Sequence, residues 1–167
     1  VAPAVAIGAS GEHADFPGTL SIGSAALTGV AVELGRSATV TAPRLVFCNG
    51  HGGNVEALTR AVDVLRAEGR SVVLHTPTFT GGDAHAGRTE TSLMLALAPD
   101  AVRLDRLEAG VVAPLPDLWP RLRRDGVRAV SPNGVLGDPQ GASADEGRRL
   151  LEEAIGALVA ACASLGT

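Results

Sequence analysis

The sequence contains no lysine, so all 14 of its basic residues are arginines. The absence of lysine excludes Schiff-base catalysis and the lysine of phosphate-binding loops. The arginines form no rich tract and the formal net charge is −4, so we expect no nucleic-acid partner, because neutralising phosphates requires clustered cations. No apolar run approaches a bilayer span and no cationic start leads into a signal segment. We therefore expect a soluble, cytoplasmic protein without a membrane partner.

Cysteine is scarce. Cys48 and Cys162 lie far apart, each among apolar neighbours, and we expect two buried thiols rather than a disulfide. The 167 residues, 46% of them hydrophobic, suffice for a single domain that buries roughly 70% of its unfolded surface. Residues 1–7 have the composition of a strand already under way and include no initiator methionine. We therefore expect that residues 1–167 form one domain that lacks its N-terminal portion.

Apolar runs of strand length alternate with amphipathic helical patterns along the chain, which is typical of βαβ units around a largely parallel sheet. The segment 76–88 carries three glycines and no helical period, so we expect a loop there. The expected strands are residues 5–7, 44–48, 71–75 and 127–130, and the expected helices are residues 21–34, 55–68, 90–97 and 143–159.

Residues 49–54 read Asn-Gly-His-Gly-Gly-Asn and directly follow an expected strand. Ligands in open α/β sheets bind beyond the carboxyl ends of the strands, and His51 lies at such a position. Gly52 and Gly53 would let the backbone approach a ligand, so they are candidate substrate-binding residues, and Asn54 would cap the next helix. The alternative is an ordinary strand-to-helix turn with an incidental polar residue.

A second polar segment covers residues 83–92. His85 in the loop and Glu90 in the first helical turn are ligand types that borderline divalent metals prefer, and we expect them to converge with His51 on a metal site. Stabilisation of the helix dipole would also explain Glu90, but it does not explain His85. Asp83 would orient a histidine or act as a base, and a solvated loop carboxylate is an equally good interpretation.

Two more histidines follow expected strands. His13, within the polar segment 12–19, would join the site as a substrate-binding residue, or it belongs to a polar turn before a helix. His75 ends the expected strand 71–75, and we expect a near-core histidine whose polar atoms are satisfied.

The order of several motifs matches a known family. Phe-Pro-Gly-Thr at 16–19, Asn-Gly-His at 49–51, the block 85–92, and Gly-Val-Leu-Gly-Asp-Pro at 134–139 with Ala-Ser at 142–143 resemble the creatininase-type metal-dependent amidohydrolases. This resemblance spans most of the chain. Cys48 before the Asn-Gly-His segment and the residues 81–88 are most similar to the branch of that family that acts in mycofactocin biosynthesis.

The resemblance implies a three-layer α/β/α fold with a mostly parallel central sheet, a homo-oligomer, and two divalent metal ions that would be zinc, iron or manganese. By motif position, His51 would bind one metal and Glu90 the other, and His85 would assist proton transfer to the leaving amine. The branch implies a peptide substrate, the modified mycofactocin precursor, hydrolysed near its C-terminus to release a Val-Tyr-derived unit. A separate N-terminal fragment is a further candidate partner.

The chain departs from the family pattern at three places. Ala84 stands where creatininase proper has an acidic residue, so Asp83 is the nearest substitute for it. Gly53 stands where creatininase has a carboxylate, which argues against creatinine as the substrate. The family's Glu-x-His-Gly and aspartate metal ligands have no equivalent in the 167 residues, in line with a missing N-terminal portion. Two alternatives therefore stay open: a family member acting on a small cyclic amide or formamide, and a non-catalytic peptide-binding domain of the same fold.

Overall fold

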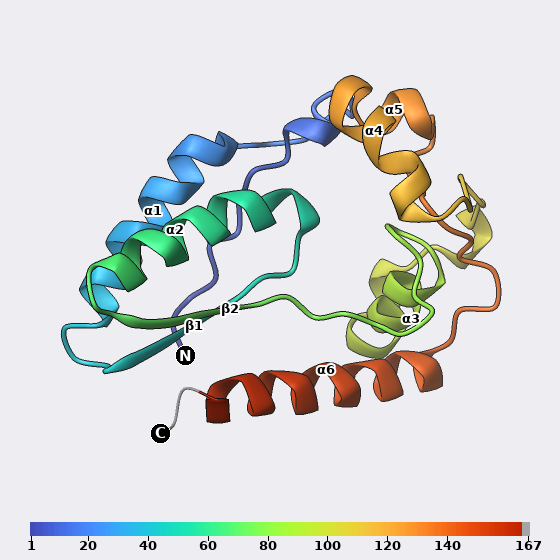
Figure 1. The fold of residues 1–167 in the computed structure, drawn as a ribbon. Coiled ribbons are helices and arrows are strands. Elements are labelled where there is room, and N and C mark those ends of the chain that lie inside the picture. Colours follow the sequence, from blue (N-terminus) through green and yellow to red (C-terminus); the bar gives the residue numbers. More distant parts are fainter. Residues whose placement is uncertain (165–167) are drawn as a thin grey trace. The chain divides into compact units, whose positions relative to one another are not determined.

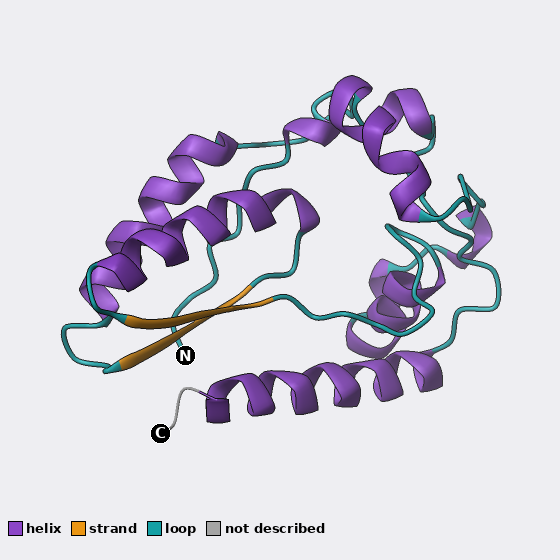
Figure 2. Ribbon diagram, in the orientation of Figure 1, coloured by secondary structure: helices purple, strands orange, loops and turns teal. Residues whose placement is uncertain are grey.

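The computed structural model describes residues 1–164. It divides into two compact units, one made of Val1–Pro77 with the C-terminal segment from Ala157, and the other made of Thr78–Gly156. We call them unit 1 and unit 2. Figures 1 and 2 show the helices and strands of each unit.

Unit 1 contains a β-α-β arrangement preceded by a helix. Its elements are α1 (Gly23–Ala38), β1 (Arg44–Cys48), α2 (Val55–Ala67) and β2 (Ser71–His75), with 3-10 turns η1 (Gly11–His13) and η2 (Gly52–Asn54). The two strands pair in parallel, with Arg44 opposite Ser71 and Cys48 opposite His75, because the crossover through α2 returns the chain in the same direction. The expected α/β class with parallel strands is confirmed, and the carboxyl ends of both strands lie at one edge of the sheet.

Apolar contacts hold α1, α2 and the strands of unit 1 together. Ala31 and Val32 of α1 are buried against Leu58 and Ala61 of α2, and Phe47 of β1 packs on this cluster. A second cluster joins the end of α2 to the first residues of β2. Figure 1 shows α1 and α2 side by side. Gly35 and Leu65 pack so closely that a Cβ added at Gly35 would lie within 3.0 Å of the leucine methyl carbons.

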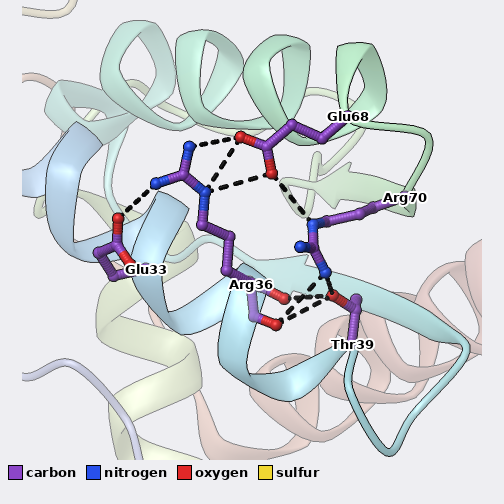
Figure 3. A network of polar contacts seen from close by, with 6 residues as sticks. Glu33, Arg36, Thr39, Glu68 and Arg70 are labelled. Carbon is purple, nitrogen blue, oxygen red and sulfur yellow. Dashed lines mark hydrogen bonds and ion pairs between the residues drawn. The ribbon is translucent and has the colours of Figure 1, made fainter.

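A polar network joins the ends of the two helices on the exposed side of unit 1 (Figure 3). The Arg36 guanidinium donates to the Glu68 carboxylate, which also accepts from Arg70 Nε at 3.1 Å. Arg36 reaches Glu33 as well, and Arg70 donates to Thr39 Oγ1. The hydrogen bonds from Arg36, and then those from Arg70, lower the pKa of Glu68 from 4.5 to about 2. Position 68, just past the end of α2, therefore carries a carboxylate that stays ionised well into acid.

Unit 2 is built from helices and loops. A loop precedes α3, and the segment 134–139 returns to that loop through a short antiparallel bridge between His85 and Leu136. The helical elements are α3 (Arg88–Leu97), η3 (Pro99–Ala101), η4 (Leu104–Arg106), α4 (Leu115–Asp125), α5 (Val127–Val130) and the start of α6 (Ala144–Ser164).

Two expected strands are absent from residues 1–164. Residues 5–7 are exposed coil, since no described strand pairs with their backbone groups. Residues 127–130 form the helical turn α5, in which Val127 and Val130 are both buried. Their i, i+3 spacing places both side chains on one face of a helix, and a segment of four residues is too short for its pattern to distinguish a strand from a helical turn.

The expected burial of the cysteines is also wrong. Cys48 and Cys162 are free, as expected, but both are exposed. Cys48 is the last residue of β1, and at that position the thiol projects from a sheet that has two strands among the described residues. None of the helices in residues 1–164 combines the length and apolar character that a membrane crossing requires.

Candidate active site

Asn49 holds the loop that follows β1. It is buried, with 2% of its surface exposed, and its backbone N–H donates to the carbonyl of His75 at 2.8 Å. Its side chain accepts from the backbone N–H of His51 at 3.2 Å and donates to the carbonyl of His51 at 2.9 Å. Because both backbone groups of His51 are bound in this way, the imidazole is fixed just beyond the carboxyl end of β1, where the sequence predicted it.

Asn54 does not cap α2 as expected, since its side chain makes no capping hydrogen bond. It instead accepts from the backbone N–H of Ala9 at 2.9 Å and donates to Asn49 Oδ1 at 3.3 Å. A Cβ at Gly8 would lie within 3.0 Å of the Asn54 side chain. Asn54 therefore binds the segment before η1 to the loop after β1.

This arrangement brings Glu12 to His51. Glu12 Oε1 lies 3.0 Å from His51 Nε2, and each side chain is 30% exposed. The same ring nitrogen lies 3.2 Å from the carbonyl oxygen of Ala9 and 3.2 Å from Ser10 Oγ. His13, the expected substrate-binding residue, lies beside them, with its ring centroid 5.9 Å from that of His51. Sequence analysis passed over Glu12, because a glutamate in a polar turn before a helix is commonplace.

Gly53 makes room for this cluster. A Cβ at position 53 would lie within 3.0 Å of Glu12 Oε1, of the Ala9 carbonyl oxygen and of His51 Nε2. A Cβ at Gly52 would meet nothing within 4 Å. The close approach of Glu12, Ala9 and His51 therefore requires a glycine at position 53. Position 52 lies open beside these residues.

In unit 2, Asp83 caps α3. One carboxylate oxygen accepts from the backbone N–H of Arg88, and the other accepts from that of Thr89 at 3.2 Å. A Cβ at Gly87 or at Gly137 would lie within 3.0 Å of this carboxylate. Free N–H groups at the start of a helix favour a negative charge there, which explains the contact physically.

His85 and Glu90 form the second histidine–carboxylate pair. His85 Nδ1 lies 3.5 Å from Glu90 Oε2, and the side chains are 37% and 49% exposed. The backbone of His85 is paired with Leu136, whose N–H donates to the His85 carbonyl at 2.8 Å. The motif 134–139 thus holds the histidine in place.

Ala86 lies between the members of this pair and has a strained backbone. Its φ of 53° is the one positive value at a non-glycine residue within 1–164, and such a conformation costs about 1–2 kcal/mol. Its N–H donates to the Glu90 carboxylate. This hydrogen bond, together with the bridge at His85, offsets the strain and fixes the orientation of the pair.

Buried hydrogen bonds support α3 two residues beyond Glu90. Ser92 has 0% exposure, donates to Glu146 Oε2 at 3.0 Å and accepts from the N–H of Ser143 at 3.1 Å. Glu146 also pairs with Arg88 at 2.8 Å. The hydrogen bond from Arg88, with a smaller effect of Ser92, lowers the pKa of the Glu146 carboxyl. At the start of α6, the backbone N–H of Glu146 donates a capping hydrogen bond to Ser143 Oγ at 3.3 Å.

An apolar pocket of about 560 Å³ opens beside Glu90. Leu93, Met94 and Leu97 of α3 form one wall of it, and Arg103 adds a positive charge at its edge. The pocket therefore offers an apolar surface next to one carboxylate and one guanidinium.

His75 differs from the expectation. Its Nε2 is buried without a hydrogen-bond partner in the described part of the chain, so the prediction of a satisfied near-core histidine is wrong. Within residues 1–164, no group of three or more His, Cys, Asp or Glu side chains is placed to hold a metal ion. The candidate donors gather in pairs, His51 with Glu12 in unit 1 and His85 with Glu90 in unit 2.

Comparison with known proteins identifies the family. The model of the creatininase family, described as creatinine amidohydrolase, matches residues 1–162. A mycofactocin precursor peptide peptidase from Mycobacterium tuberculosis is 62% identical over 150 residues, which cover 90% of this chain and 60% of that protein. The protein of the same name from Mycobacterium ulcerans is 59% identical over 155 residues, covering 93% and 62%.

A more distant relative is the creatinine amidohydrolase of Pseudomonas putida, which is 37% identical over 170 residues, covering 86% of this chain and 64% of that protein. The chain thus spans a little over 60% of the length of the two named peptidases. The parallel α/β unit, the histidine at the carboxyl end of β1 and the match over residues 1–162 agree, and the chain therefore belongs to the creatininase family.

Proposed function

We propose that the protein is a metal-dependent amide hydrolase that cleaves the modified mycofactocin precursor peptide near its C-terminus and releases the Val-Tyr-derived unit. The observation that carries the proposal is the presence of two histidine–carboxylate pairs, each with its histidine on a motif of the family. The substrate follows from the similarity to proteins named mycofactocin precursor peptide peptidase, which extends over 90% of the chain.

We assign His51 to one metal ion and Glu90 to the other. Imidazole nitrogen and carboxylate oxygen suit zinc, iron and manganese, and the donor chemistry therefore fits. Each pair supplies two donors, and water, substrate and other donors would complete the coordination of an ion that takes four or more. When bound, such ions polarise a carbonyl and lower the pKa of water.

His85 would move the proton that the leaving amine requires. Its Nδ1 lies close to Glu90 Oε2, so a carboxylate stabilises the charged imidazolium, as general acid catalysis requires. Asp83 is assigned a supporting role, because its two oxygens accept from the backbone at the start of α3. It would hold the His85 loop against the helix, and proton transfer by Asp83 stays a prediction.

Substrate binding is assigned to two places. In unit 1, His13, Gly52 and Gly53 border His51 and would contact the peptide backbone. In unit 2, the apolar pocket beside Glu90 would take an apolar or aromatic side chain, which suits a substrate carrying valine and tyrosine. By family resemblance, we also propose a homo-oligomer, which light scattering on the purified protein would test.

The proposal is tested with His51→Ala and Glu90→Gln. Both variants should keep the wild-type circular dichroism spectrum, lose bound metal and lose cleavage of the precursor peptide as followed by mass spectrometry. Glu56→Gln is the matched control, because Glu56 forms an exposed ion pair with Arg60 on α2. Full cleavage by folded, metal-free His51→Ala would refute metal-dependent hydrolysis. Peptide binding without any cleavage by the wild type would favour the non-catalytic domain.

A second candidate function is hydrolysis of a small cyclic amide or formamide. The 37% identity to a creatinine amidohydrolase favours it. Turnover of such compounds, with none of the precursor peptide, would decide for this alternative.

A further inference from the structure

The His51 ring nitrogen lies among three oxygen atoms. Nε2 is 3.0 Å from Glu12 Oε1, 3.2 Å from the carbonyl oxygen of Ala9 and 3.2 Å from Ser10 Oγ. A neutral imidazole nitrogen either donates one proton or offers one lone pair. A proton on Nε2 would be donated to one of these oxygens or shared between two, whereas a lone pair would be repelled by the Glu12 and Ala9 oxygens unless a cation lay among them. A cation held by the nitrogen and the carboxylate would remove this repulsion.

We propose that Glu12 is a second protein ligand, beside His51, for the metal ion bound in unit 1. This inference rests on the proposed function, and it assigns to Glu12 a role that neither the motif nor the comparisons indicate. The carboxylate of Glu12 and the imidazole of His51 would bind the same ion through Oε1 and Nε2.

The separation of the two donor atoms fits one coordination sphere. Protein nitrogen and oxygen ligands lie about 2.0–2.2 Å from zinc, so two of them at a right angle are about 3.0 Å apart and at a tetrahedral angle about 3.4 Å apart. The observed Nε2 to Oε1 separation is 3.0 Å. Both side chains are 30% exposed, which leaves the pair accessible to an ion from solution.

The position of Glu12 is built into the local structure. Two hydrogen bonds and the turn η1 hold residues 8–13 in place. The backbone N–H of Ala9 donates to the Asn54 side chain, and that of Ser10 donates to Ser21 Oγ at 2.9 Å. The glutamate therefore extends from an ordered turn rather than from a free chain, and little backbone entropy is lost on binding an ion.

Gly53 is the second, independent observation. A Cβ there would lie within 3.0 Å of the donor atoms of both Glu12 and His51. The φ of Gly53 lies outside the left-handed region, so its own conformation does not exclude a side chain; the neighbouring atoms do, namely the two donor atoms and the carbonyl oxygen of Ala9. Glycine at 53 thus keeps open the volume that the Glu12 carboxylate occupies.

The first experiment measures binding of Co²⁺ alone to the purified protein by calorimetry and by the visible d–d absorption. Glu12→Gln should weaken the binding of one ion more than about 100-fold, beyond the 10–100-fold typical of residues that only orient a ligand. The spectrum of the ion that still binds at high Co²⁺ should change, because a ligand has been lost. His51→Ala should weaken the same ion, and Glu56→Gln should behave like the wild type.

The second experiment moves the carboxylate. Gly53→Ala should weaken Co²⁺ binding in the same direction as Glu12→Gln, because the new methyl group displaces the carboxylate. Glu12→Asp keeps a carboxylate at position 12 on a side chain one methylene shorter, and it should bind Co²⁺ more tightly than Glu12→Gln does. This arm reports on the ligand even if one single variant folds poorly, as checked by circular dichroism.

The possible results distinguish the role of Glu12 as a metal ligand from the proposed function of the protein. Loss of the ion in His51→Ala together with wild-type affinity and spectrum in Glu12→Gln overturns the role of Glu12 and leaves the proposed function standing. Weakening by Glu12→Gln with an unchanged spectrum, and equal weakening by Glu12→Asp, also overturns it, because Glu12 then only hydrogen-bonds the imidazole. Wild-type binding in both single variants overturns the inference and the proposed function alike.

Discussion

Ser92 offers a test of how α3 is held in place. Its side chain is fully buried, donates to Glu146 and accepts from the N–H of Ser143. Ser92→Ala removes both hydrogen bonds and leaves the N–H of Ser143, an exposed residue, to bind water instead. A hydrogen bond to a charged group contributes about 1.5–3 kcal/mol, and one between neutral groups contributes about 0.5–1.5 kcal/mol. Since Glu146 is 22% exposed and water can replace part of the loss, we expect a decrease of about 1–3 kcal/mol in the free energy of unfolding.

Urea denaturation followed by circular dichroism at pH 7 measures this change. Thr91→Ala is the control, because it removes a hydroxyl from the same helix outside the hydrogen bonds of Ser92. A decrease below about 0.5 kcal/mol for Ser92→Ala, or one equal to that of the control, would refute the reasoning. It would mean that α3 and α6 do not depend on the serine hydroxyl.

Ser92→Ala should also change how the free energy of unfolding depends on pH. The pKa of Glu146 is lowered in the folded protein, first by Arg88 and also by Ser92. A lowered folded-state pKa contributes stability above the unfolded pKa, and this contribution is lost as the pH falls through the folded value. The difference between wild type and Ser92→Ala should therefore shrink as the pH is lowered from 7 to below the folded pKa of Glu146.

Three further predictions concern stability. The pKa of Glu68 is lowered to about 2, mainly by Arg36, so the ionised carboxylate stabilises the fold and this stability is lost as the pH falls from about 4.5 to 2. Glu68→Gln should therefore lose less stability than the wild type over this pH range. Melting temperatures measured across the range check this, and a profile equal to that of the wild type would contradict it. Gly147→Ala should destabilise by about 1–3 kcal/mol in urea denaturation, since a Cβ there would clash with the carbonyl of Ser92; a neutral result would disprove the close contact of α3 and α6. Leu65→Ala should lower the free energy of unfolding by about 2–5 kcal/mol, as Leu65 has 0% exposure; a loss under about 1 kcal/mol would show that the packing of α1 on α2 adjusts freely.

Elements with a long, consistent pattern were predictable. Residues 44–48 and 71–75 were predicted as strands and are β1 and β2 within the same bounds. The expected helix 55–68 corresponds to α2, and Gly69, the residue after that range, has a φ of 79°. These predictions succeed because a continuous apolar run and a glycine with positive φ are set by the local sequence and do not depend on contacts with distant residues.

Shorter patterns failed for an equally physical reason. Residues 5–7 are apolar but have no described strand to pair with, and residues 127–130 bury two valines from a single helical turn. The side chain of Asn54 hydrogen-bonds Ala9 and Asn49 instead of capping α2. In each case a contact far away in the sequence decided between two locally acceptable structures.

The amino-acid sequence by itself determined the α/β class, the parallel strands and the motif histidines at 51 and 85, because hydrophobic period and strand ends are local properties. The sequence also predicted that Glu90 lies beside His85, whereas only the tertiary structure decided that Glu12 lies beside His51. Glu90 is five residues from its histidine, whereas Glu12 is separated from His51 by a helix and a strand. Its approach depends on the hydrogen bonds of Asn54 and on the missing side chain at Gly53, which act through space and leave no periodic pattern along the chain.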